Sequence, residues 1–193
     1  APVLALGALA LLGFSAAAGV VYHNTNRLNV YRSSTDTRAL AARYEKTYRA
    51  RLADLPQARL TAVDLAVDLY PSQHRLAARG TLTLSNKGTR PVAEVWMNLP
   101  AEASVTRLEL DRPHQVAHED RALGVRALRL TTPLAPGERT ALAVELTWGK
   151  RGFGNENDFH AIVDNGTFVN NFQFLPSFGY RQERELVTDS DRR

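Results

Sequence analysis

Hydrophobic residues fill the start of the chain without a break. Residues 1–22 carry no charge, and Arg27 is the first charged side chain. A helix of this length rises about 30 Å, the thickness of the hydrocarbon core of a bilayer. Tyr22 ends this stretch and His23 follows it, at the position where aromatic side chains would lie at a membrane interface. We therefore interpret residues 1–22 as a transmembrane helix that anchors a water-exposed body.

Two other interpretations of this segment remain open. Residues 16–18 are three alanines and resemble the cleavage site of a secretory signal peptide, although the segment lacks an initiator Met and a basic start. A buried core helix is the other alternative, although few soluble helices are apolar on every face. Because the apolar run opens on Ala1-Pro2 without a flank, we expect it to be the last span of a longer membrane part.

A helical period follows the polar stretch at residues 24–34. The helix formers from Thr35 to Leu52 carry an apolar stripe spaced by four, consisting of Leu40, Tyr44, Tyr48 and Leu52. Ser34, Thr35 and Asp36 are candidate N-caps, and Pro56 ends the helix. We expect residues 23–56 to be a juxtamembrane linker with an amphipathic helix. This helix either packs against the body or forms a stalk that sets the distance from the bilayer.

After Pro56 the hydrophobic period changes from four to two. Alternation over short runs bounded by turn residues predicts six strands, at residues 63–70, 76–84, 95–99, 105–110, 124–130 and 140–148. On the first strand, Asp64 and Asp68 fall on the face opposite Val63 and Val67, which predicts an ordinary solvated face. The chain is therefore expected to be mainly β, with an antiparallel sandwich or a saddle-shaped sheet over residues 57–180.

The amino-acid composition changes in the last part of this body. Residues 166–180 are dense in aromatic side chains and side-chain amides. We expect Phe172, Phe174 and Phe178 to anchor the segment on the body. The polar side chains then left to face a ligand or partner are Asn170, Asn171 and Gln173. Residues 181–193 form a strongly charged tail that we expect to lead into a further domain.

Composition narrows the function classes. The formal net charge is +4, and Lys and Arg are interleaved with Asp and Glu without a run of five like charges. This pattern favours a mixed solvated surface and argues against nucleic-acid binding. The chain has no cysteine, which excludes disulfides and thiolate sites.

The sequence contains no complete catalytic constellation. His114 and His118 are four residues apart, but they lie near Pro113 between strand candidates, where we expect a polar hairpin and no helix to align two metal ligands. The run from His118 begins like the zinc motif His-Glu-x-x-His but ends in Ala122. Gly152 and Gly154 are too close together for a phosphate loop and predict a turn.

Several short motifs, in order, carry a resemblance to a known family. The paired strands at 65–71 and 76–84 resemble the opening of the N-terminal domain of M1-family zinc aminopeptidases. Three further segments are similar to bacterial fusions of an ABC-2 type permease with an M1-like peptidase: 22–32, 44–48 and 174–180. The tail at 184–192 also fits these fusions. At 176–179, where the family often has Pro-Cys-Phe-Asp, Ser177 and Gly179 replace the Cys and the Asp.

The resemblance implies a bacterial inner-membrane protein with its soluble domain on the extracytoplasmic side. Zinc and the catalytic motifs are expected in a peptidase domain outside this segment, so no catalytic residue and no metal ligand is assigned here. Expected partners are that zinc domain, the membrane, an ABC ATPase subunit and a peptide substrate. In M1 enzymes this domain can place an amide or carboxylate near the substrate's amino terminus, and Asn170, Asn171 and Gln173 are the candidates. An anchored β-sandwich binding module and a secreted β-domain with a signal peptide are the alternatives.

Overall fold

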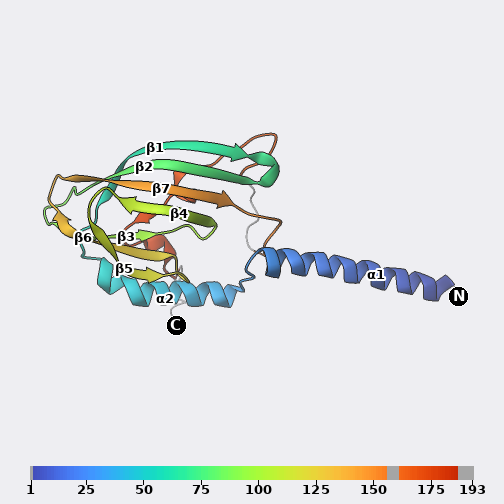
Figure 1. Cartoon of the computed structure of the whole chain (residues 1–193). Coiled ribbons are helices and arrows are strands. Elements are labelled where there is room, and N and C mark those ends of the chain that lie inside the picture. Colours follow the sequence, from blue (N-terminus) through green and yellow to red (C-terminus); the bar gives the residue numbers. More distant parts are fainter. Residues whose placement is uncertain (1, 156–160, 187–193) are drawn as a thin grey trace.

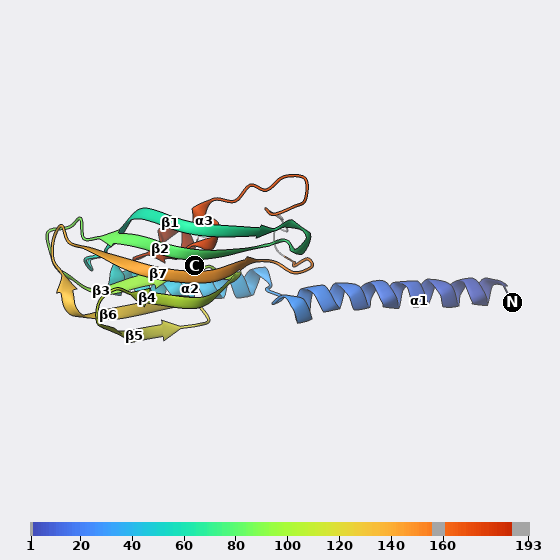
Figure 2. The same cartoon turned by 45° about the horizontal axis from the view of Figure 1, so that its top comes forward.

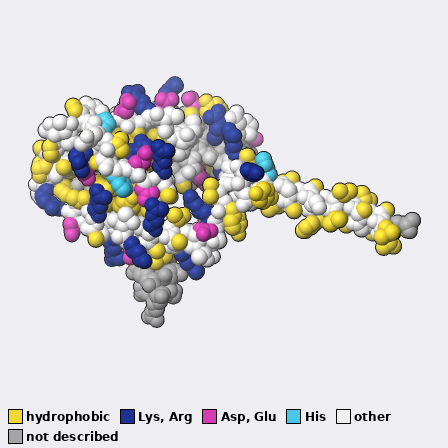
Figure 3. Space-filling view, turned by 60° about the horizontal axis from the view of Figure 1, so that its bottom comes forward, with side chains coloured by type: hydrophobic (Ala, Val, Ile, Leu, Met, Phe, Trp, Pro, Cys, Tyr) yellow, Lys and Arg dark blue, Asp and Glu magenta, His cyan; other side chains and the backbone are white. Residues whose placement is uncertain are grey.

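The computed structural model describes residues 2–155 and 161–186. Its N-terminal helix α1 (Pro2–Tyr22) buries no residue and continues into a π-helical turn, η1 (His23–Leu28). Together they form a helix long and apolar enough to cross a membrane. Figures 1 and 2 show α1 projecting away from the body, and in Figure 3 apolar side chains run along its length. The predicted helix is confirmed, and η1 extends it by six residues beyond Tyr22.

The body consists of two four-stranded antiparallel sheets. The first, sheet A, has the order β1-β2-β7-β4, and the second, sheet B, has the order β5-β6-β3-β8. The strands are β1 (Arg59–Tyr70), β2 (Arg75–Ser85), β3 (Val92–Asn98), β4 (Ala103–Leu110), β5 (His114–Asp120), β6 (Val125–Leu134), β7 (Arg139–Gly149) and β8 (Ser177–Phe178). The predicted antiparallel β fold is confirmed.

All six predicted strands are present, but two further strands were missed. The region of His114 and His118 is strand β5 rather than the expected polar hairpin, and it pairs with β6. Its sequence, HQVAHED, carries too few apolar residues to show an alternating pattern. The two-residue strand β8 is too short to produce a period, and it exists because Met97 and Asn98 of β3 offer it a partner edge.

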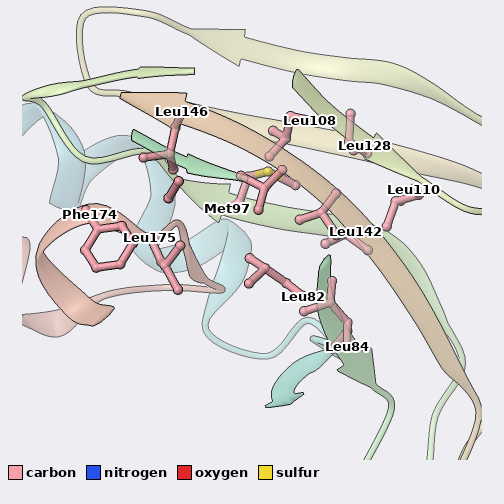
Figure 4. Close-up of a cluster of buried hydrophobic side chains, with 14 of the residues drawn as sticks. Leu82, Leu84, Met97, Leu108, Leu110, Leu128, Leu142, Leu146, Phe174 and Leu175 are labelled. Atoms are coloured by element: carbon pink, nitrogen blue, oxygen red, sulfur yellow. The ribbon is translucent and has the colours of Figure 1, made fainter. Parts of the chain in front are cut away.

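The main core lies between the sheets (Figure 4). Sheet A contributes Leu82 and Leu84 from β2 and Leu142 and Leu146 from β7, each at most 1 % exposed, and Met97 and Leu128 of sheet B complete it. Phe174 and Leu175 also belong to this cluster. Burial of these side chains supplies the main driving force for closing the sandwich.

Helix α2 (Ser34–Leu52) packs on the outer face of sheet B. Tyr44, Tyr48 and Leu52 are buried in a second cluster with Trp96, Leu123, Val125 and Ala127, and Leu40 is packed against it. This decides between the two interpretations of the stripe in favour of packing against the body. The N-cap is Ser33, one residue before the predicted candidates, because its hydroxyl accepts from Asp36 N while the Asp36 carboxylate accepts from Ser33 N. Such a reciprocal capping box fixes the start of a helix.

Strand β1 departs from the expectation of one solvated and one buried face. Asp64 and Asp68 are exposed as predicted, but Val63, Val67 and Leu69 are also 37–48 % exposed. Opposite residues of paired strands share a face, so these three side chains lie on the same face as the buried residues of β2. Strand β1 is therefore an edge strand whose inner face extends past the cover of sheet B.

Candidate functional site

The three predicted site residues lie at one short helix, α3 (Asn171–Phe174). Asn170 is its N-cap: the Asn170 Oδ1 atom accepts from Phe172 N at 3.0 Å, and Gln173 Oε1 accepts from Asn170 N at 2.9 Å. Two of the three predicted amide oxygens therefore satisfy the backbone of their own helix. Asn171 is exposed, and its side chain bonds to no other residue that the structure describes. It is the amide best placed to meet a ligand.

Helix α3 forms a ridge between two open grooves. The first groove, of about 1150 Å³, runs between the stretch from Leu52 to Val63 and the segment from Asn170 to Arg181. The second, of about 1210 Å³, lies between α2, the turns at 98–105 and 119–126, and residues 181–186. Asn170 and Asn171 line the first groove and Gln173 lines the second, so the structure divides the predicted residues between two surfaces.

The phenylalanines of this segment do not share one role. Phe174 is 4 % exposed and belongs to the core, as predicted, and Phe178 is partly buried against it. Phe172 was also expected to anchor the segment, but it is 85 % exposed and lines both grooves. The prediction for Phe172 was wrong because the single turn of α3 turns Phe172 outward and Phe174 into the core. The exposed ring of Phe172 therefore adds apolar surface to both grooves.

The ridge is held in place by the stretch that follows it. Strand β8 pairs with β3, Gly179 N donates to Trp96 O at 2.9 Å, and Asn98 Nδ2 donates to Gly179 O at 2.9 Å. Gly179 has φ +77°, and a Cβ there would lie 3.2 Å from Gln57 Cγ. Gly179 is thus a structural glycine at a left-handed position.

Gln57 is a groove residue that the sequence did not single out. Its Oε1 accepts from Trp96 N at 3.3 Å, while its Nε2 atom is buried and has no partner among the described residues. A buried amide donor without an acceptor is costly to a folded protein. Gln57 follows Pro56 between α2 and β1, and a single polar residue there forms no recognisable sequence pattern. Only the structure could therefore identify it as a groove residue.

A polar cluster under α2 joins this helix to strand β5. Tyr48 Oη lies 2.8 Å from His118 Nε2 and donates to Asp120 Oδ2 at 3.2 Å. Burial, followed by the nearby Asp120 carboxylate, raises the pKa of Tyr48 to about 12. Asp120 is also paired with Arg43 at 2.8 Å. These hydrogen bonds fasten α2 to β5. The position of His118 is therefore accounted for by a structural contact with Tyr48 and needs no catalytic role.

The start of the tail is fastened to the same helix. Arg181 N donates to Tyr44 Oη at 3.0 Å, and Arg184 donates to Asn98 Oδ1 and to Leu123 O. Tyr180 donates to Glu185, and burial together with that carboxylate raises the pKa of Tyr180. Residues 181–186 therefore belong to the body. Residues 187–193 of the predicted tail, like His160, lie outside the described residues.

No metal site is formed by the part of the chain that the structure describes. Within 2–155 and 161–186, no group of three or more His, Asp or Glu side chains is arranged to hold a metal ion. His114 Nδ1 lies 2.9 Å from Arg112 O, and His118 contacts Tyr48. These described residues do not fit a zinc site.

Comparison with known proteins gives little direct guidance. No family model matches the chain, and no curated protein matches it. A search of solved structures finds a crystal structure of a two-domain M1 zinc metallopeptidase mutant bound to L-tryptophan, at 18 % identity and a TM-score of 0.36. The match covers 50 % of this chain and 20 % of that protein, so this chain spans a small part of it. We draw no conclusion about function from this match.

Proposed function

We propose that this chain is the membrane-anchored, non-catalytic N-terminal β-domain of an M1-like zinc metallopeptidase fused to an ABC-2 type permease. In this proposal the body docks on the zinc domain and closes one wall of its cleft. The support is the sequence resemblance at 22–32, 65–84 and 174–180, together with an antiparallel sandwich that follows an apolar helix.

The observation that carries the docking role is the uncovered inner face of β1 beside the ridge of α3. Val63, Val67 and Leu69 are 37–48 % exposed, whereas their partners on β2 are buried, and Phe172 is 85 % exposed. Val63 and Phe172 line the same groove. A contiguous exposed apolar surface of this kind is typical of a protein interface.

The amides at the ridge supply the proposed contact with a peptide. Asn171 is exposed, and each of the Asn170 and Gln173 oxygens has a second lone pair beyond the backbone N–H that it accepts. An amide oxygen can accept a hydrogen bond from the ammonium group of a peptide amino terminus. In this proposal the zinc chemistry would come from the other domain.

The membrane part of the proposal places α1 across a bacterial inner membrane, with the sandwich on the extracytoplasmic side and an ABC ATPase subunit as a further partner. The absence of cysteine makes this side directly testable. A single cysteine introduced at the exposed Thr89 should react with a membrane-impermeant maleimide added to intact cells. Labelling only after permeabilisation would contradict the proposed side.

Peptidase assays on the natural full-length protein test the main proposal. We expect metal-dependent aminopeptidase activity, and we expect Asn171→Ala to lower kcat/KM for peptides while leaving the folding of the body unchanged. Asn165→Ala, an exposed amide outside both grooves, is the matched control. Absence of metal-dependent activity, together with no effect of Asn170, Asn171 or Gln173 substitutions, would refute the proposal.

The second candidate is an anchored binding module without a peptidase role. Two open grooves of more than 1100 Å³ beside an exposed aromatic ring favour it, because such surfaces also suit an extended ligand. The natural chain separates the two candidates. A His-Glu-x-x-His with a later Glu downstream supports the peptidase, whereas its absence supports the module.

A further inference from the structure

The junction between α1 and the body is a clamp of hydrogen bonds rather than a loose linker. Asn29 Nδ2 donates to Arg151 O at 2.8 Å and to Phe153 O at 3.2 Å, and Phe153 N donates to Asn24 Oδ1 at 3.3 Å. Arg32 N donates to Asn155 Oδ1 at 3.2 Å, and Asn155 Nδ2 donates to Arg32 O. The stretch 24–32 is thereby tied to the loop 151–155 that follows β7.

Gly152 shows how closely the two stretches fit. Its φ is +61°, a left-handed conformation, and a Cβ at this position would lie 1.9 Å from Asn24 Oδ1. Any residue larger than glycine would push the loop away from η1. The clamp therefore depends on local geometry that the sequence Gly152-x-Gly154 alone did not reveal.

The clamp lies at the end of the sandwich from which α1 departs. The register of β2 and β7 pairs Arg75 with Gly149 at this end and Ser85 with Arg139 at the opposite end. Figures 1 and 2 show α1 leaving beside the end of β7 and the β1–β2 turn. If α1 crosses a bilayer, this end of the body faces the headgroups.

The side chains around the clamp have the composition of a membrane-contacting surface. Arg27 and Arg151 are exposed, Arg32 is half-buried, and none of the three makes an ion pair with another described residue. Stretches 1–35 and 146–155 contain no Asp or Glu, while in the sequence Asp36 follows the first stretch, Glu145 precedes the second, and Glu156 and Asp158 follow it. Apolar and aromatic side chains lie among the arginines: Tyr22, Val30 and Tyr31 are 54–75 % exposed, and Phe153 is 36 % exposed. Interleaved arginines and aromatics suit the boundary between headgroups and acyl chains.

We propose that this surface, formed by residues 22–32 and 150–155, docks the body on anionic phospholipid headgroups of the adjoining leaflet. The arginines contact the phosphates, and the aromatic side chains enter the boundary below them. The clamp favours this docking because its hydrogen bonds hold residues 22–32 and residues 150–155 together, so that both stretches can contact the headgroups at the same time. The inference rests only on the membrane-anchoring part of the proposed function and is independent of any peptidase role.

The test uses the whole chain of 193 residues in lipid nanodiscs. A dye on Ser72→Cys in the β1–β2 turn reports the clamp end, and a dye on Thr89→Cys reports the opposite end. Quenching by a nitroxide-labelled lipid headgroup measures how close each dye lies to the bilayer. In nanodiscs that contain phosphatidylglycerol, whose anionic headgroups attract Lys and Arg side chains near the surface, we expect strong quenching of the Ser72 dye only. In pure phosphatidylcholine we expect this quenching to fall.

Charge variants test whether docking of this surface depends on the negative charge of the lipid headgroups. The triple variant Arg27→Gln, Arg32→Gln, Arg151→Gln should lower the ratio of docked to undocked molecules by about fivefold for each arginine removed. The matched control Arg79→Gln, Lys87→Gln, Arg139→Gln removes the same charge elsewhere and should leave the quenching unchanged. Gly152→Ala should also reduce quenching, whereas Gly166→Ala, where a Cβ meets nothing within 4 Å, should not.

The outcomes separate this inference from the anchoring itself. Equal quenching in both lipids, or equal effects of the two triple variants, would overturn the inference while leaving the anchor intact. A chain that fails to stay with the nanodisc in either lipid would overturn the anchoring and this inference together. Far-UV circular dichroism of each variant establishes that a loss of quenching comes from a folded body.

Discussion

Strands β1 and β2 carry the same alternating pattern and lie side by side, yet only one of them is buried. Val63 pairs with Leu82 and Leu69 pairs with Leu76 across the ladder. Leu82 and Leu76 are at most 1 % exposed, whereas Val63 is 37 % and Leu69 is 48 % exposed. The difference shows that alternation fixes which face a side chain occupies, while the neighbouring sheet decides whether that face is covered. The uncovered part is the surface that we assign to a docking partner.

The largest expected effect comes from the covered strand. Leu82→Ala should destabilise the fold by about 2–5 kcal/mol, because it removes buried methyl groups and leaves a cavity in the sandwich core. Val63→Ala, its directly paired neighbour, is the control and should cost less than about 1 kcal/mol. Urea unfolding followed by tryptophan fluorescence measures both. Similar losses for the two variants would contradict the contrast between the strands.

Strands β1 and β2 approach each other closely at Gly80. Gly80 of β2 has φ +154°, and a Cβ there would lie 2.1 Å from the carbonyl oxygen of Asp64 on β1. Gly80→Ala should therefore destabilise the protein by about 1–3 kcal/mol by forcing β1 away from β2. Hydrogen exchange of the β1 amides should rise more than that of β6. If exchange rises equally in both strands, the effect is not local to the edge.

Sheet B differs from the β1 edge because α2 covers its outer face. Tyr48→Phe removes the hydrogen bonds to His118 and Asp120 and should cost about 1 kcal/mol at neutral pH. Because the folded pKa of Tyr48 is raised to about 12, its stabilising effect is complete below pH 10 and is lost as pH rises from 10 through 12. Tyr48→Phe should flatten this alkaline loss. Thermal melts between pH 8 and pH 12 measure it, and an unchanged pH profile would contradict the assignment.

The smallest expected change in stability belongs to the uncovered face. Val67→Ser should alter the free energy of unfolding of this chain by about 0.5 kcal/mol or less, because the side chain is already 43 % exposed. In the natural full-length protein the same change should increase protease sensitivity at the boundary after the sandwich, since it weakens docking. Asp68→Ser, on the opposite face of the same strand, is the control. Equal sensitivity of both variants would locate the interface elsewhere.

The sequence predicted the parts of the fold that depend on period. The apolar helix, the stripe through Tyr44 and Tyr48, and six strands follow from runs long enough to show a pattern. Strand β5, with two histidines and two acids, carries no apolar period and forms because β6 offers an edge. Phe172 was misplaced for a related reason, since one helical turn contains too few residues to show which side faces the core.

Composition singled out the amide-rich aromatic segment at 166–180, but it did not determine the geometry of this segment. The structure places Asn170, Asn171 and Gln173 beside two grooves, and their contact with a ligand stays a prediction. That Asn170 and Gln173 cap their own helix depends on the backbone, which the amide composition does not determine. The uncovered face of β1 and the clamp at Gly152 arise from tertiary contacts, and no local pattern encodes them.

The clamp also has a mechanical consequence if α1 crosses a bilayer. The hydrogen bonds from Asn24 and Asn29 to the loop after β7 would then transmit a tilt or rotation of that helix to the sandwich. The eleven residues of β2 span about 35 Å, so a tilt of about 10° would move the far turns by about 6 Å. Movement within the bilayer would thus be amplified at the opposite end of the body.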